Sequence, residues 1–219
     1  MKIALENVSL RFGAGDYLLQ NVSLAFEPGQ FAIVNGPSGS GKSSFLRLLN
    51  RLQDPTAGRL LFDDEPVEDA AVPHLRRRIG FVQQTPVMLE GNVRHNLLLP
   101  YTYRLAGAAA PPDDPFLRSQ LERYLLDIDL EEDTQPLSVG QRQRLSLIRS
   151  QLVEPEVILC DEPTSALDPD SRRVVEERLS ELCTAGGVTV VVVTHFDRAP
   201  KGIACRRLRL SDGKLVEAS

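Results

Sequence analysis

The chain has 219 residues, of which 42% are hydrophobic and 25% are charged, and its formal net charge is −5. This composition is typical of a globular protein, and no apolar run approaches the ~18 residues that suggest a transmembrane helix. Its three cysteines lack CxxC or Cys/His spacing, which favours free thiols over disulfides or zinc, and the acidic balance argues against nucleic acid as the main partner.

The first strong motif follows a set of expected N-terminal strands and the apolar segment 31–34. Residues 36–43 match the phosphate-binding loop G-x-x-x-x-G-K-[ST], whose glycines let backbone N–H groups surround a phosphate. In this loop the lysine reaches the β and γ oxygens and the last hydroxyl ligates Mg²⁺. The residues expected to hold the nucleotide are Gly36, Pro37, Ser38, Gly39, Ser40, Gly41, Lys42, Ser43 and Ser44. The buried face of the following helix is expected to carry Phe45, Leu48, Leu49 and Leu52.

The middle of the chain predicts a change from strands to helices. Residues 58–67 favour a hairpin, 78–84 favour a strand, and 86–150 favour a mostly helical second lobe. Within that lobe, Asp114 and Pro115 are expected to be the N-cap and first residue of a helix. The buried side of this helix is expected to carry Leu117, Leu121 and Leu125.

A second helix start lies in the segment LSVGQRQR, residues 137–144. Ser138 and Gln141 have the spacing of a capping box, and an apolar face follows them. Such a start needs no ligand. However, a helix N-terminus with free N–H groups, a hydroxyl and Gly140 is also suited to bind an anion.

An acidic pair follows the apolar run 157–160. Adjacent buried carboxylates are costly unless a cation or hydrogen bonds meet them, so Asp161 is expected to hold Mg²⁺ and Glu162 to polarise an attacking water. Asp168 begins the next helix and is expected at least to cap it. A buried strand at 188–193 and a hairpin around Asp212-Gly213 complete the pattern of an α/β fold with a parallel sheet.

Taken together and in order, these motifs resemble those of the ATP-binding subunits of ABC transporters. The matching elements are the P-loop at 36–43, a Q-loop at Gln84, the signature LSVGQ at 137–141, the Walker B pair Asp161-Glu162, the D-loop at 165–168 and a switch histidine at His195. The resemblance implies a P-loop NTPase of the ABC type, with a RecA-like core, an antiparallel β subdomain and a helical subdomain. We expect residues 1–219 to form one such domain, with the core and β subdomain at about 1–84 and 151–219 and the helical lobe at about 85–150.

The resemblance also implies roles for residues that the local patterns leave open. Gln84 is implied to reach Mg²⁺ and the reacting water, and His195 the γ-phosphate. Phe12 would stack on the adenine, with Tyr17 as the alternative. We expect a homodimer in which two copies bind head to tail, so that each ATP contacts the partner's Ser138, Gly140 and Gln141. The signature usually has glycine where this chain has Val139, for which we expect altered packing without loss of activity.

The function implied is ATP hydrolysis that powers transport through a separate integral membrane subunit, with the chain in the cytoplasm at the inner face of the cell membrane. A weaker resemblance of residues 84–101 points to metal export, notably of iron. An ABC-type soluble ATPase acting on DNA or ribosomes is the alternative, but no long heptad insertion and no second P-loop is present. Docking to the membrane subunit is expected between the lobes, near Met88 and Leu89, whereas Leu97 to Leu99 could equally be core.

Overall fold

The computed structural model describes residues 1–218 except 12, 14, 16, 67–70, 103–109, 196–199 and 201. Between residues 31 and 193 every two successive strands are separated by at least one helix, which confirms the α/β prediction. The elements are β1 (Ile3–Arg11), β2 (Tyr17–Phe26), β3 (Phe31–Asn35), α1 (Lys42–Leu49), β4 (Ala57–Phe62), α2 (Val72–Arg78), β5 (Ile79–Val82), α3 (Val93–Thr102), α4 (Asp114–Arg123), α5 (Val139–Gln151), β6 (Val157–Asp161), α6 (Pro169–Thr184), β7 (Thr189–Val193), β8 (Cys205–Ser211) and β9 (Lys214–Glu217).

The smaller sheet is antiparallel and has the strand order β2-β1-β4. Its third strand corrects the predicted hairpin at 58–67, because β4 pairs with β1 and not with the chain that follows it. After β4 the chain makes a tight turn in which Phe62 bridges Glu65. A turn of this kind is a local feature, whereas the pairing with β1 depends on a strand more than fifty residues earlier.

The larger sheet has the order β5-β6-β7-β3-β8-β9. Its first five strands are parallel, and β9 returns antiparallel to β8 as the predicted hairpin. Parallel strands end at the same edge of a sheet, where open α/β folds bind their ligands. The edge here carries the P-loop after β3, the acidic pair at the end of β6 and His195 after β7.

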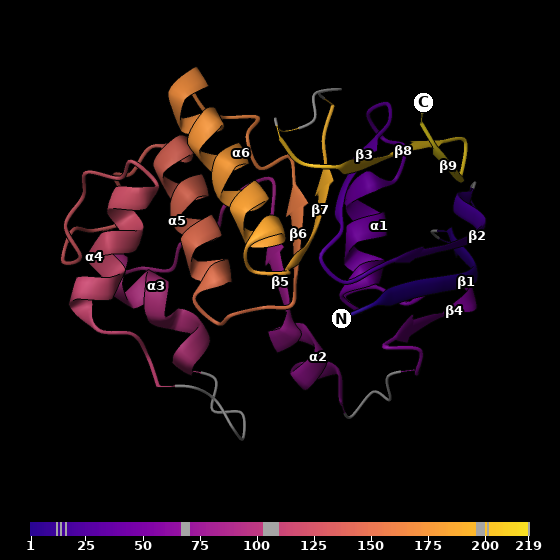
Figure 1. Cartoon of the computed structure of the whole chain (residues 1–219), viewed down its shortest axis with the longest axis horizontal. Helices are drawn as coiled ribbons and strands as arrows, with labels where there is room; N and C mark the ends of the chain where they lie inside the picture. Colours follow the sequence, from indigo (N-terminus) through magenta and orange to yellow (C-terminus); the bar gives the residue numbers. More distant parts are fainter. Residues whose placement is uncertain are drawn as a thin grey trace.

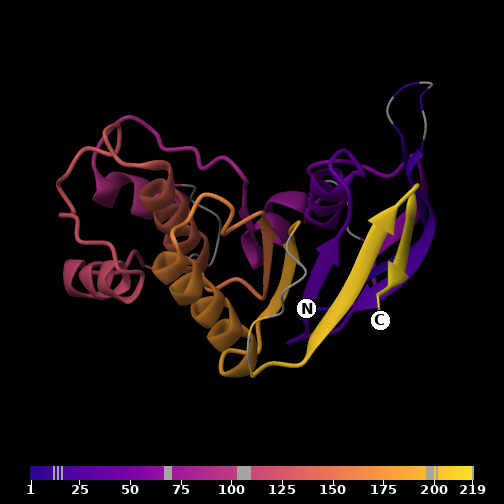
Figure 2. The ribbon, with the colours of Figure 1, turned by 90° about the horizontal axis from the view of Figure 1, so that it is seen from above.

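The larger sheet has a core on each face. Along β3, Ala32 and Val34 belong to a cluster with α1 and the small sheet, whereas Phe31 and Ile33 belong to a cluster with α3 to α6. This alternation is the period-2 pattern of a strand buried on both sides. Helices α3, α4 and α5 gather at the end of the molecule away from the small sheet (Figure 1), and the view from above agrees (Figure 2).

Helix boundaries correct three predictions. Helix α1 ends at Leu49, so Leu52 lies beyond it and is 49% exposed. Helix α4 begins one residue earlier than expected, because Asp113 is its N-cap and accepts the backbone N–H of Phe116. The same helix ends at Arg123, which leaves Leu125 outside it and 54% exposed.

The three cysteines are free thiols, as predicted. Among the helices in the described ranges, none combines the length and the apolar character that a membrane-crossing segment requires.

Candidate functional site

The P-loop joins the carboxyl end of β3 to the start of α1. Gly41 is the N-cap of α1 and has φ 96°, a left-handed conformation that glycine adopts without strain. Gly36 lies against β8 so closely that an added Cβ would be 2.2 Å from the carbonyl oxygen of Leu210. The buried Lys42 donates from Nζ to the carbonyls of Gly36, at 2.8 Å, and Pro37, at 2.9 Å. The loop is therefore closed around its own lysine.

A hollow of about 340 Å³ opens beside this loop. It brings together residues from four of the predicted motifs: the P-loop, the Q-loop, the acidic pair and the switch histidine. The lining consists of Leu18, Ser38, Gly39, Gly41, Lys42, Ser43, Ser44, Gln84, Asp161, Glu162 and His195. The sequence alone thus identified every lining residue except Leu18.

Leu18 is the residue that the sequence analysis missed. It sits on β2, and its Cβ would be 3.2 Å from a Cβ added to Gly41. Its neighbour Tyr17 is absent from the lining and stacks instead under the guanidinium of Arg11, 5.5 Å from the ring centroid. Phe12, the predicted adenine-stacking residue, lies outside the described residues. Leu18 was missed because an apolar residue in a β-strand looks the same in the sequence whether it contacts a ligand or packs in the core.

The acidic pair is held at the end of β6. Asp161 is the last residue of the strand and pairs in register with Val193 of β7. Glu162 then adopts φ 48°, and its N–H donates to the carbonyl of Val193 at 2.9 Å. The backbone N–H and hydroxyl of Ser165 both donate to the Glu162 carbonyl. These bonds fix a turn that would otherwise be unfavourable for a residue with a side chain.

The side chain of Glu162 lies next to the switch histidine. Its Oε1 is 3.1 Å from Nε2 of His195, with 5% of the glutamate side chain and 50% of the histidine side chain exposed. This contact lacks hydrogen-bond geometry, so within the described part of the chain the buried Oε1 accepts no hydrogen bond. A buried, unsatisfied carboxylate oxygen is costly, and a donor from a bound water or ligand would satisfy it.

The hollow also presents the donors that Mg²⁺ prefers. Ser43, Gln84 and Asp161 all line it and offer a hydroxyl, an amide carbonyl and a carboxylate. Mg²⁺ binds oxygen ligands and is commonly held by one or two carboxylates together with phosphate oxygens, so these residues fit that ion.

The signature segment forms the predicted capping box at the start of α5. The backbone N–H of Gln141 donates to Oγ of Ser138 at 3.2 Å, and the backbone N–H of Ser138 donates to Oε1 of Gln141 at 2.9 Å. Val139 is 47% exposed and is not among the residues with positive φ, so its side chain fits the helix without strain. None of Ser138, Gly140 and Gln141 lines the P-loop hollow.

The D-loop packs beside the signature. A Cβ added to Gly140 would lie 3.3 Å from the side chain of Leu167. Asp168 caps α6 by accepting the backbone N–H groups of Asp170 and Ser171, and the bond to Ser171 lowers the pKa of the Asp168 carboxyl. The capping role predicted for Asp168 is confirmed.

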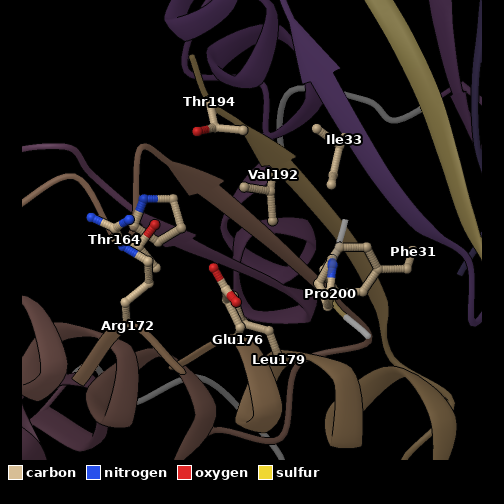
Figure 3. Close-up of a pocket in the computed structure, with 10 residues that line it drawn as sticks. Phe31, Ile33, Thr164, Arg172, Glu176, Leu179, Val192, Thr194 and Pro200 are labelled. Carbon is tan, nitrogen blue, oxygen red and sulfur yellow. The ribbon is translucent and has the colours of Figure 1, made fainter. Parts of the chain in front are cut away.

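A second, smaller hollow of about 90 Å³ lies on the α6 side of the sheet (Figure 3). Arg172 and Glu176 reach it from α6, opposite Phe31 and Val192. The latter two belong to the core cluster on that face, so this hollow is separate from the P-loop site.

The chain is similar to known proteins along most of its length. A family model described as ABC transporter matches residues 19–165, which include the P-loop and the acidic pair. ABC transporter I family member 17 of Arabidopsis thaliana is 40% identical over 84% of this chain and 69% of its own length. The methionine import ATP-binding protein MetN of Xanthomonas campestris pv. campestris is 36% identical over 98% of this chain, which spans only 61% of that protein.

The fold is also that of a solved relative. The chain superposes on a dimeric structure of a post-hydrolysis state of the ATP-binding cassette MJ0796, bound to ADP and Pi, with a TM-score of 0.82. The two are 31% identical, and the match covers 98% of both chains. The motifs, the fold and these similarities agree, and this chain therefore belongs to the ABC transporter family as one of its ATPase cassettes.

Proposed function

We propose that this chain hydrolyses ATP at an interface between two copies and so powers transport through a separate membrane subunit. The observation that carries the proposal is the division of the predicted site. The P-loop hollow is lined by the residues predicted for binding and chemistry, whereas the signature residues lie outside it at an exposed helix N-terminus. A second copy, placed head to tail, would bring its signature to this hollow.

Within one chain, the P-loop would bind the phosphates of ATP. Its backbone N–H groups and the ammonium of Lys42 supply positive charge at the N-terminus of α1. Ser43, Gln84 and Asp161 would hold Mg²⁺, which neutralises charge on the phosphate oxygens when bound. Most of the catalysis would then come from positioning and charge stabilisation.

The reacting water would be prepared by Glu162. Its unsatisfied Oε1 accepts the proton of a water that approaches the γ-phosphate in line. His195, 3.1 Å from that oxygen and half exposed, would contact the γ-phosphate and help to orient the water.

The second copy would contribute Ser138, Gly140 and Gln141. With the capping box formed, the remaining free N–H groups of the first turn of α5 point out of the helix end and favour an anion. ATP extends to the partner's helix end and ADP does not, so hydrolysis would weaken the interface. This difference in affinity is what could drive a conformational cycle.

The membrane subunit would dock in a groove of about 650 Å³ between the lobes. Apolar side chains such as Phe81, Leu99 and Val153 share its lining with three arginines, and none of the described residues that line it is acidic. A segment that carries both apolar and acidic side chains would complement it. The full lining is Pro73, Arg76, Arg77, Ile79, Gly80, Phe81, Leu99, Pro100, Tyr101, Ser146, Arg149, Ser150 and Val153.

Met88 and Leu89, the interface residues predicted from sequence, do not line this groove. Leu97 is fully buried and serves packing, whereas Met88 is only partly buried against the helical core, so its predicted docking role stays a prediction. Leu89 is 43% exposed and remains available for a contact with the membrane subunit outside this groove.

The cargo is a separate question. The name of MetN specifies methionine import. Neither of the two relatives described above is named for metal export. The predicted link to iron export therefore has no support from these similarities. The predicted location at the inner face of the cell membrane depends on binding to a membrane subunit, and it is part of this proposal.

The test is reconstitution with the membrane protein encoded beside this chain. We expect the two to copurify and the cargo to stimulate ATP hydrolysis in liposomes. Arg77→Glu and Leu89→Glu should reduce this stimulation while ATP binding is kept, whereas Leu52→Glu, at an exposed leucine outside the groove, should not. Isolation with ribosomes or DNA, and no membrane partner, would contradict the transport assignment.

A further inference from the structure

Helix α5 is tied by side chains to the segment that carries Gln84. Nε2 of Gln143 donates to the carbonyl of Gln83 at 3.3 Å, and the guanidinium of Arg149 donates to the carbonyl of Val87 at 3.0 Å. The two accepting carbonyls lie on either side of Gln84 in the chain. The helix that Ser138 caps therefore contacts both flanks of the Q-loop.

The side chain of Gln143 is buried, which gives its contact with Gln83 weight. Gln143 is 2% exposed, and its Oε1 has no hydrogen-bond partner in the described part of the chain. Such an arrangement is unfavourable for packing alone, because an apolar side chain of the same shape would avoid the unsatisfied oxygen. The hydrogen bond that Nε2 of Gln143 donates to Gln83 explains why an amide stands at this position.

Arg149 has a similar character. Burial lowers the pKa of its guanidinium, and among the ion pairs of the described residues none includes Arg149. Its hydrogen bond to the carbonyl of Val87 offsets part of the cost of this partial burial. The same side chain also lines the docking groove, so it lies between that groove and the Q-loop.

We propose that Arg149 and Gln143 are positioning residues, which hold Gln84 where it can reach the Mg²⁺ of bound Mg-ATP. The inference rests on the proposed function, because the role of Gln84 toward Mg²⁺ is part of it. Neither side chain lines the P-loop hollow, so both act through the Q-loop backbone. Loss of either bond should leave the P-loop intact and weaken only the contribution of Mg²⁺.

The experiment measures ATP binding in the Glu162→Gln background, with Mg²⁺ and with EDTA. In EDTA, we expect Arg149→Ala to bind ATP with the affinity of the parent. The increase in ATP affinity that Mg²⁺ causes, here called the Mg²⁺ gain, should be about tenfold smaller in this variant. Arg149→Lys keeps a cationic donor and should recover part of that gain. Arg123→Ala, which removes an exposed arginine paired with Glu181, is the control and should match the parent.

Gln143→Met provides a second variant that does not depend on the folding of Arg149→Ala. It keeps the length of the side chain, removes the donor and also removes the unsatisfied oxygen. We expect the same selective loss of the Mg²⁺ gain, with thermal stability equal to or above that of the parent.

Two results would overturn the inference. The first is an undiminished Mg²⁺ gain in both Arg149→Ala and Gln143→Met. The second is an equal loss of ATP affinity in EDTA and in Mg²⁺, which would indicate a purely structural role. A parent protein with no Mg²⁺-dependent ATP binding would instead contradict the proposed function itself.

Discussion

At the scale of single residues, Glu162 combines an unusual backbone with an unusual side chain. Its left-handed φ costs on the order of 1–3 kcal/mol and persists only when neighbouring bonds determine it, as those to Val193 and Ser165 do here. The turn carries the carboxylate from the end of β6 into the P-loop hollow, beside His195. The strain is consistent with a side chain that is placed for chemistry.

Replacing Glu162 by glutamine should separate binding from hydrolysis. The amide keeps the shape but no longer accepts a proton from water, so we expect kcat to fall by about 10²- to 10⁴-fold while ATP binding survives. Phosphate release and nucleotide affinity are the two measurements. Glu177→Gln, at an exposed position on α6, should be unchanged. Normal turnover in the Glu162 variant would show that another group activates the water.

Glu156 should make stability depend on acid pH. Arg78 donates to both of its carboxylate oxygens and lowers the pKa of Glu156, against the opposing effect of burial. Because the folded pKa lies below the unfolded value of about 4.3, the stabilisation is fully present above that pH and is lost as the pH falls through the folded pKa. For this half-exposed pair we expect Glu156→Gln to cost at most about 1 kcal/mol at pH 7.

Denaturant unfolding of the parent and Glu156→Gln at pH 7 and at pH 3 checks the sign. The difference in unfolding free energy between the two proteins should shrink at the lower pH. A difference that stays constant would mean that the carboxylate charge is not the source of the stabilisation.

At the scale of elements, α5 connects three regions. Its first turn presents the signature, its middle contacts the Q-loop through Gln143, and its last turn reaches Val87 and the docking groove through Arg149. A helix is stiff along its length, so a displacement of α5 at one of these regions also moves the other two. The helix is thus the element through which docking and ATP binding could be coupled.

Two substitutions at Ser138 should distinguish its structural role from its role toward phosphate. Ser138→Ala removes the cap and should cost about 1 kcal/mol of stability, measured by denaturant unfolding. Ser138→Asp keeps a good N-cap and places negative charge at the favourable helix end, so stability should be preserved. The same carboxylate would repel the γ-phosphate on the partner, and ATP-dependent dimerisation should be lost. A stable Ser138→Asp protein that still dimerises with ATP would remove Ser138 from the interface.

Sequence patterns predicted the elements with local causes. The capping box of α5, the P-loop between β3 and α1, and the hairpin at Asp212-Gly213 depend on residues that are close in sequence, and all three have the predicted conformation. The pairing of β4 with β1 and the contact of Leu18 with the P-loop depend on distant segments and were not predicted. The bonds from Gln143 and Arg149 to the Q-loop are of the same kind, since they span about sixty residues.

At the scale of the whole molecule, the central claim is that one chain holds only part of the ATP site. The P-loop hollow and the signature lie on the same chain but do not share a lining, and the solved relative MJ0796 is dimeric with ADP and Pi bound. ATP would then hold two copies together until its γ-phosphate is removed. The membrane subunit in its groove would convert that cycle of association into movement.

Sedimentation of the Glu162→Gln protein with nucleotides tests this claim most directly. With Mg-ATP we predict a dimer that contains two nucleotides, and with Mg-ADP a monomer. The Ser138→Asp form of the same protein should stay monomeric with either nucleotide. A Glu162→Gln chain that remains monomeric at saturating Mg-ATP, while the unmodified chain hydrolyses ATP at full rate as a monomer, would contradict the account.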